Sequence, residues 1–255
     1  MGFADRWAKT VLGLGHHRLR AAFARSELER LQLGVMVEGL DELCRGAETG
    51  DEEMRTTLGA FVPSIVDRRD VERVTGLRAT ANAGTWLAAR RLLRGSTYAG
   101  FGLDRNQKPV GQVAQKGDGR PMTLGERRAL ARKPTRQALD ALMRDPHPLV
   151  VRLLLQNPRI TEDDVLRMAA HRPANAAVAC EIAMAWSRHG RTRMALTLNP
   201  YVPPAVAVPL LGLLNRHELL QVARARDLPA VVRATARELF DLRPPIPTPR
   251  STTRH

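Results

Sequence analysis

The residues of this chain that could bind a charged partner are concentrated in one stretch. Residues 71–160 contain 17 lysines and arginines against six acidic residues, whereas residues 31–60 carry a net charge of −5. Basic side chains at this density attract nucleic-acid phosphate, an acidic protein or an anionic membrane surface. The candidate anion or nucleic-acid contacts are Arg90, Arg91, Arg94, Arg105, Lys108, Arg127, Arg128, Arg132, Lys133 and Arg136.

The strong preference for arginine has a second explanation. Only four of the 40 basic residues are lysines, so 36 are arginines. Such a skew arises from a GC-rich genome as readily as from selection for the planar guanidinium that binds phosphate. The sequence therefore leaves open whether the basic stretch is a binding surface or an ordinary solvated face.

The other chemistry-bearing residues form no catalytic or metal-binding pattern. No two of the seven histidines have the i,i+4 spacing that places two metal ligands on one helix face. The chain also lacks a glycine-rich phosphate loop and a Gly-x-Ser-x-Gly nucleophile motif. Acidic residues at 52–53 and 162–164 fall at expected helix starts, where they complement the helix dipole. We therefore expect no catalytic activity, no cofactor, no metal ion and no small-molecule substrate.

The cysteines and the apolar segments indicate a cellular location. Cys44 and Cys180 are the only cysteines, and two such thiols in a chain without a secretion signal are more often reduced. No stretch reaches the roughly 18 uninterrupted apolar residues of a membrane-spanning helix. These features predict a cytoplasmic protein.

The elements that must position the basic residues are predicted to be helices. The chain is 44% apolar but only 4% aromatic, so its core is built from aliphatic side chains that favour helices. Phe3, Trp7 and Val11 share one helical face, which is more typical of a helix packed on its neighbours than of a membrane anchor. An apolar pattern through residues 28–43 predicts a longer helix that ends at Gly46.

Local signals also place helix starts in the second half of the chain. Thr161 followed by Asp164 approximates a capping box, with the acidic side chain in the first turn. Asp145-Pro146 and Arg172-Pro173 predict helix starts, because proline fits the first turn, where its missing N–H is not needed.

Glycine and proline divide the chain into four parts. Residues 1–95 are predicted to form an N-terminal helical region. Residues 96–122 have no sustained periodicity and are predicted to be an irregular basic linker. Residues 123–241 are predicted to form a C-terminal repeat domain, and the proline-rich tail 242–255 is expected to be disordered.

The most informative pattern is an internal repeat. Residues 152–158 and 194–200 each run from an apolar helix face into Asn-Pro, and the two pairs, Asn157-Pro158 and Asn199-Pro200, lie 42 residues apart. Lys133-Pro134 precedes the first pair by 24 residues. Recurrence of this kind is typical of stacked helical repeats, in which each unit buries its apolar face against its neighbours.

These segments resemble a known family. Lys133-Pro134-Thr135, Asp145-Pro146, Val151-Arg152 and Asn157-Pro158 resemble the leucine-rich repeat variant, a HEAT-like bacterial helical-repeat family. The likeness is good over residues 123–173 and looser to residue 240. The resemblance implies stacked antiparallel helices and a protein-interaction role. Together with the irregular segment 96–122, it predicts an all-α fold, a HEAT-like α-solenoid in two helical halves.

Two activities found among similar proteins do not carry over. Some members of the family hold an iron–sulfur cluster on four clustered cysteines, which this chain lacks. Some HEAT-like proteins excise alkylated bases from DNA with tryptophans and an aspartate. Trp86 and Trp186 lie in no matching motif, so we expect both to pack in the core.

Two functions remain after this comparison. The first is a non-catalytic scaffold or adaptor that binds a protein partner through its helical-repeat surface. The alternative is a sequence-independent nucleic-acid-binding protein that uses a basic stripe around residues 90–136. Only Tyr98 and Phe101 are available there for base stacking, which disfavours single strands. Arginines gathered on one edge would favour nucleic acid, and scattered arginines would favour the scaffold.

Overall fold

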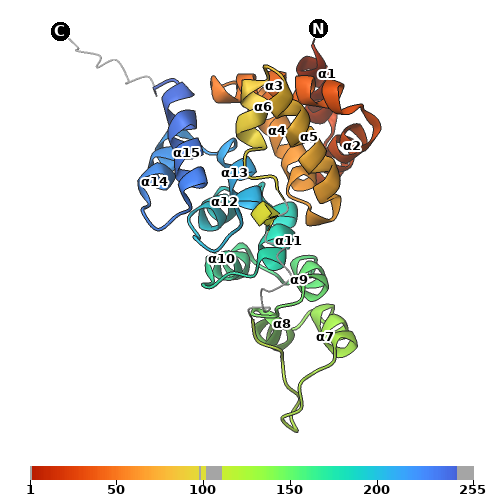
Figure 1. The fold of residues 1–255 in the computed structure, drawn as a ribbon. Coiled ribbons are helices and arrows are strands. Elements are labelled where there is room, and N and C mark those ends of the chain that lie inside the picture. Colours follow the sequence, from red (N-terminus) through yellow and green to blue (C-terminus); the bar gives the residue numbers. More distant parts are fainter. Residues whose placement is uncertain (1, 98, 102–110, 246–255) are drawn as a thin grey trace, which may run out of the picture.

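The computed structural model describes residues 2–97, 99–101 and 111–245 (Figure 1). All regular secondary structure in these ranges is helical, apart from one isolated antiparallel bridge between Gln115 and Pro121. This confirms the all-α class predicted from the sequence. None of the described helices is both long enough and apolar enough to cross a membrane.

The first group of helices comes from the N-terminal part of the chain. Its central helix is α3, which contacts α1, α4, α5 and α6. The group consists of α1 (Phe3–Gly13), α2 (His17–Arg30), α3 (Leu33–Glu48), α4 (Glu52–Ile65), the 3-10 turn η1 (Arg68–Asp70), α5 (Val71–Ala83) and α6 (Leu87–Leu92). Trp7 and Val11 are buried, as the predicted apolar face of α1 requires.

The second group forms an elongated stack of shorter helices (Figure 1). Helices two positions apart in the chain contact each other: α7 with α9, α9 with α11, and α10 with α12. The group consists of α7 (Leu124–Ala131), α8 (Arg136–Leu142), α9 (Pro148–Leu155), α10 (Glu162–Ala170), α11 (Ala176–Trp186), α12 (Gly190–Thr197), α13 (Pro204–Leu211), α14 (Arg216–Arg224) and α15 (Ala230–Leu242).

The two Asn-Pro turns make equivalent contacts in this stack. Asn157 Nδ2 donates to the carbonyls of Ala131 and Lys133, at the end of α7, at 2.8 and 3.0 Å. Asn199 Nδ2 donates to the carbonyls of Ala169 and His171, at the end of α10, at 2.9 Å each. Each asparagine thus binds the last orphan carbonyls of the helix two positions earlier.

Because these contacts are equivalent, Asn157→Ala and Asn199→Ala should destabilise the protein by similar amounts. Each change removes three side-chain hydrogen bonds, two donated by Nδ2 and one accepted by Oδ1, and leaves buried carbonyl groups unsatisfied, which costs about 2 kcal/mol. Urea unfolding followed by circular dichroism measures the cost. Gln156→Ala, at an exposed neighbouring position, is the control and should change stability little. Unequal costs for the two asparagines would argue against equivalent repeat units.

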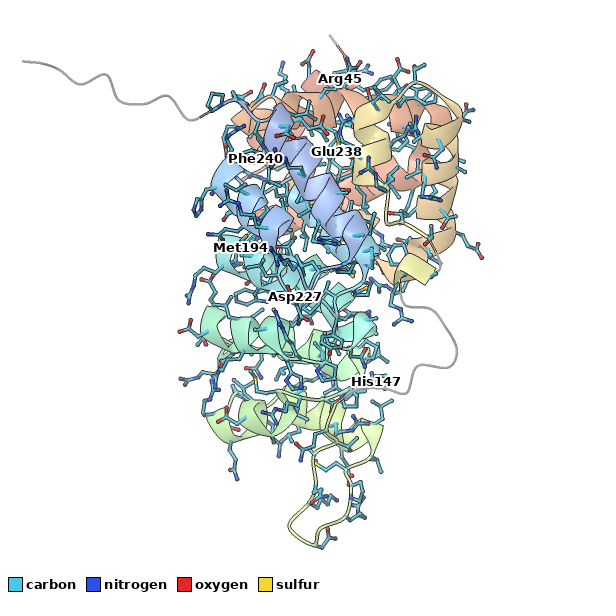
Figure 2. The ribbon with its side chains drawn as sticks, turned by 60° about the vertical axis from the view of Figure 1, so that its left-hand side comes forward. Arg45, His147, Met194, Asp227, Glu238 and Phe240 are labelled. Atoms are coloured by element: carbon cyan, nitrogen blue, oxygen red, sulfur yellow. The ribbon has the colours of Figure 1, made fainter. Side chains whose placement is uncertain are left out.

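The two groups of helices pack directly on each other. Helix α4 contacts α11 and α13, and the buried apolar residues form one contiguous cluster from α1 to α15. Arg243, just after α15, is buried and donates to the carbonyls of Ala47 and Gly212, near the C-terminal ends of α3 and α13. Glu238 on α15, labelled in Figure 2, is paired with Arg94 at the end of the first group.

The segment expected to be a linker begins as part of the core. Ser96 and Phe101 are fully buried, and the 3-10 turn η2 (Ala99–Phe101) contacts α13. After the undescribed residues 102–110, an exposed turn occupies residues 115–121. The tail predicted to be disordered begins with Leu242, which still belongs to α15, and residues 246–255 lie outside the described part.

Two predicted helix boundaries in the first group are wrong. The pattern through residues 28–43 is interrupted at Leu31 and Gln32, whose backbones are extended. Arg73 on α5 donates to the carbonyls of Leu28 and Leu31, so the ends of α2 are satisfied without further helix. Gly46 lies inside α3 rather than ending it. A Cβ there would lie 2.6 Å from Met54 Cγ, so this glycine permits close packing of α3 on α4.

The proline-based helix starts are also displaced. Helix α9 begins at Pro148, capped by His147, and α11 begins at Ala176, capped by Asn175. The carboxylate of Asp145 is held by Arg127 and accepts the N–H of His147, so the helix starts later than the Asp-Pro pair. The capping box of Thr161 and Asp164 is confirmed.

Candidate functional site: an arginine-lined cleft

The candidate basic residues of α6 and its C-terminal end belong to the first group of helices, and two of them are paired. Arg91 Nε and Nη2 donate to Glu48 at 2.8 and 2.5 Å. Arg94 Nη1 and Nη2 donate to Glu238 on α15 at 2.8 Å each. Arg90 is exposed and makes no ion pair with a described residue. The paired arginines therefore join helices within the protein.

The candidate arginines of α7 and α8 include two that join successive helices. Arg127 Nη1 donates to both oxygens of the buried Asp145 at 2.7 and 2.8 Å. Arg136 donates to both oxygens of Asp164 at 2.8 Å each and also pairs with Asp140. The Arg136 guanidinium holds the pKa of the Asp164 carboxyl well below its usual range.

Of the remaining candidate basic residues, only those near the end of α7 lie close together. Arg128, Arg132 and Lys133 are exposed near the end of α7 and pair with no described carboxylate. Arg105 and Lys108 lie outside the described residues. Helix α6 packs on α3 and α5, whereas α7 lies at the far end of the stack (Figure 1). The stripe predicted around residues 90–136 is therefore divided between two distant parts of the surface.

A cleft of about 410 Å³ lies where the two groups of helices meet, and we call it the arginine cleft. Helices α2 and α4 contribute one wall, and α11 to α14 contribute the other. Its volume falls within the range of small-ligand sites. The lining residues are His17, Arg20, Ala21, Glu52, Arg55, Thr56, Gly59, Ala60, Pro63, Met184, Ala185, Ser187, Arg188, Arg193, Leu213, Asn215 and Glu218.

Two arginines of the cleft are held by backbone carbonyls at the end of α11. Arg193 Nη1 donates to the carbonyls of Ser187 and Arg188 at 2.9 and 3.0 Å, and Arg188 Nη1 donates to that of Ala185 at 3.1 Å. The C-terminal end of a helix carries partial negative charge, which favours cations there. Neither guanidinium forms an ion pair with a carboxylate of the described residues. Burial lowers the pKa of both side chains.

The other charged groups of the cleft leave a positive excess. Arg20 Nε donates to the Leu14 carbonyl at 2.8 Å, and Arg55 pairs with Glu52. Glu218 accepts the N–H of Asn215 at 2.8 Å in the capping box of α14. The lining thus holds four guanidinium groups and two carboxylates, and both carboxylates already have partners.

Two histidines lie in or beside the cleft. Burial and the charge of Arg188 lower the pKa of His17 and of His189. The ring of His189 stacks on Trp186, with 4.6 Å between the ring centroids. Both imidazoles are therefore neutral at pH 7, and His17 can offer the cleft a hydrogen bond without adding to its charge.

The described residues form no metal-binding cluster, and neither cysteine lines the cleft. No cluster of three or more histidine, cysteine or acidic side chains suited to a metal ion occurs in the described ranges. Cys44 and Cys180 are buried free thiols, and burial raises the pKa of Cys180 to about 12. What the arrangement can do is bind an anion through guanidinium groups beside an apolar wall.

Sequence reasoning missed this site. Its arginines come from segments at residues 20, 55, 188 and 193, most of them distant in the sequence, and Arg55 lies within the acidic stretch of residues 31–60. The available signals were the basic run His16–Arg20 and the cluster Arg188–Arg193. Neither segment predicts that the other lies nearby, because only the packing of α4 against α11 brings the two segments together.

Comparison with known proteins gave no match to a protein family, to a curated protein or to a solved structure. Any functional conclusion therefore depends on the geometry of the chain itself.

Proposed function

We propose that this protein is a non-catalytic adaptor that binds an acidic segment of a protein partner in the arginine cleft. The observation that carries the proposal is the pair Arg188 and Arg193: both line the cleft, Arg188 exposed and Arg193 half-buried, and neither forms an ion pair with a carboxylate of the described residues. A partly desolvated cation gains most from an incoming anion, because charge-assisted hydrogen bonds are the strong ones. The apolar lining residues would contact the neighbouring side chains of the segment.

The proposal includes a repeat architecture for the second group of helices. We infer that α7 to α15 form a HEAT-like array related to the leucine-rich repeat variant. The equivalent bonds of Asn157 and Asn199 support this inference, as do the contacts between helices two positions apart. A stack of this kind offers a long surface for a partner beyond the cleft. Action in the cytoplasm, which the sequence predicts, is part of the same proposal.

Nucleic-acid binding remains the second candidate. Arg128, Arg132 and Lys133 favour it, because they are exposed side by side and have no acidic partner among the described residues. Phosphate contact of this kind would be insensitive to base sequence and strongly weakened by salt.

Capture of a partner from a nuclease-treated lysate of the source organism tests the two candidates. We expect an acidic protein to be retained by the unmodified chain and to be lost with Arg188→Gln combined with Arg20→Gln. Arg191→Gln is the control, because Arg191 is on α12, exposed and paired with Asp163 outside the cleft.

Retention of the same protein by the cleft variant would overturn the proposal. Retention of nucleic acid that is lost on nuclease treatment and depends on Arg128, Arg132 and Lys133 would favour the second candidate.

A further inference from the structure

We propose that the arginine cleft is a phosphate-monoester site, which recognises a phosphorylated side chain on the partner segment. This inference rests on the proposed function and specifies the chemistry of the ligand.

The charge of the cleft fits a dianion. Its four guanidinium groups exceed its two carboxylates by two positive charges, and the histidine that lines it is neutral. A phosphate monoester carries about −1.5 to −2 at pH 7, whereas a carboxylate or a phosphate diester carries only one negative charge. A monoester therefore balances this excess with a single group, whereas an acidic segment would need two carboxylates.

The hydrogen-bond donors also fit phosphate. A guanidinium has five N–H groups, and Arg188 uses only Nη1 and Arg193 only Nη1 within the described structure. Arg193 Nε also has no hydrogen-bond partner there, but it is buried, so it is not one of the donors that a ligand in the cleft can reach. Each arginine is thus fixed through one nitrogen and keeps further donors unused. A phosphate monoester presents three acceptor oxygens to such donors.

The ligand must be small or presented on a narrow segment. A cleft of about 410 Å³ has the volume for a phosphorylated side chain and its neighbours. The apolar residues Pro63, Met184 and Leu213 lie beside the arginines, where the flanking residues of a peptide would pack.

Three small probes separate the ligand chemistries. Isothermal titration calorimetry would compare N-acetyl-O-phosphoserine amide, N-acetyl-aspartate amide and dimethyl phosphate, which represent a monoester, a carboxylate and a diester. We expect the monoester to bind at least about tenfold more tightly than either of the others, since it can form additional charge-assisted hydrogen bonds. Equal or tighter binding of the carboxylate or the diester would overturn the inference.

Variants of the cleft test whether the named arginines hold the phosphate. Arg188→Gln and Arg20→Gln should each weaken binding of the phosphoserine probe by about tenfold, and Arg191→Gln should leave it unchanged. Arg188→Lys should recover only part of the loss, because lysine keeps the charge but lacks the planar fork. An unchanged affinity in both glutamine variants would overturn the assignment.

Phosphatase treatment of the lysate separates this inference from the proposed function. If partner capture requires both the cleft arginines and an untreated lysate, the phosphate inference is supported. If capture depends on the arginines but survives phosphatase, the phosphate inference fails while the adaptor function stands. If the phosphoserine probe binds but no partner depends on the cleft, the adaptor function fails and the site belongs to a free phosphorylated metabolite.

Discussion

Replacement of Leu154 by aspartate is expected to lower the free energy of unfolding by more than about 4 kcal/mol, a large share of the stability of a typical domain. Leu154 lies on α9 and is 0% exposed. The substitution removes an aliphatic side chain from the core and buries a carboxylate with no partner, and both changes are unfavourable. Urea unfolding monitored by circular dichroism measures the effect.

Leu149→Asp is the matched control for this prediction. Leu149 lies on the same helix, but it is 38% exposed, so a carboxylate there remains in contact with water. The change should cost less than about 1 kcal/mol, as is usual for surface substitutions. Similar melting temperatures for the two variants would show that α9 does not pack through the Leu154 side.

The helices that the sequence predicts correctly depend on short-range signals, and tertiary packing does not override these signals in the structure. The face of Phe3, Trp7 and Val11 needs only helical periodicity, and the capping box of Thr161 and Asp164 needs only four consecutive residues. The Asn-Pro turns recur because each asparagine satisfies the same kind of helix end. Such features depend on local geometry, so one sequence is enough to predict them.

The wrong boundaries have tertiary causes. Gly46 is a helix-ending residue by local propensity, but Met54 packs against it and α3 continues to Glu48. The break at Leu31 is stabilised by Arg73, a residue 42 positions away. The residues around each boundary do not predict that Met54 or Arg73 will contact it. Local reasoning therefore identifies helical segments better than it gives their ends.

The role of each basic residue is even harder to predict from the sequence than a helix boundary is. Charge density along the sequence singled out Arg91, Arg94, Arg127 and Arg136, which are paired with carboxylates elsewhere in the fold. The arginines of the cleft were overlooked because they are scattered in the sequence. Whether an arginine is available to a ligand depends on the distance to the nearest carboxylate in space.

The buried pair of Arg127 and Asp145 gives the second large prediction. Asp145 is 3% exposed and Arg127 8%, and the pair joins α7 to the turn after α8. Asp145→Asn keeps the shape of the side chain but leaves the guanidinium charge uncompensated. Breaking a buried ion pair in this way should cost about 3–5 kcal/mol, measured as the change in free energy of urea unfolding.

A double variant tests whether the unpaired charge causes this loss of stability. Arg127→Met combined with Asp145→Asn removes the stranded guanidinium, so the double variant should be more stable than Asp145→Asn alone. Asp140→Asn is the control, because Asp140 pairs with Arg136 at the surface, where both side chains are about half exposed, and it should cost less than about 1 kcal/mol. A double variant no more stable than Asp145→Asn would mean that Arg127 stabilises this end of the stack through its packing, and that the charge of Asp145 contributes little.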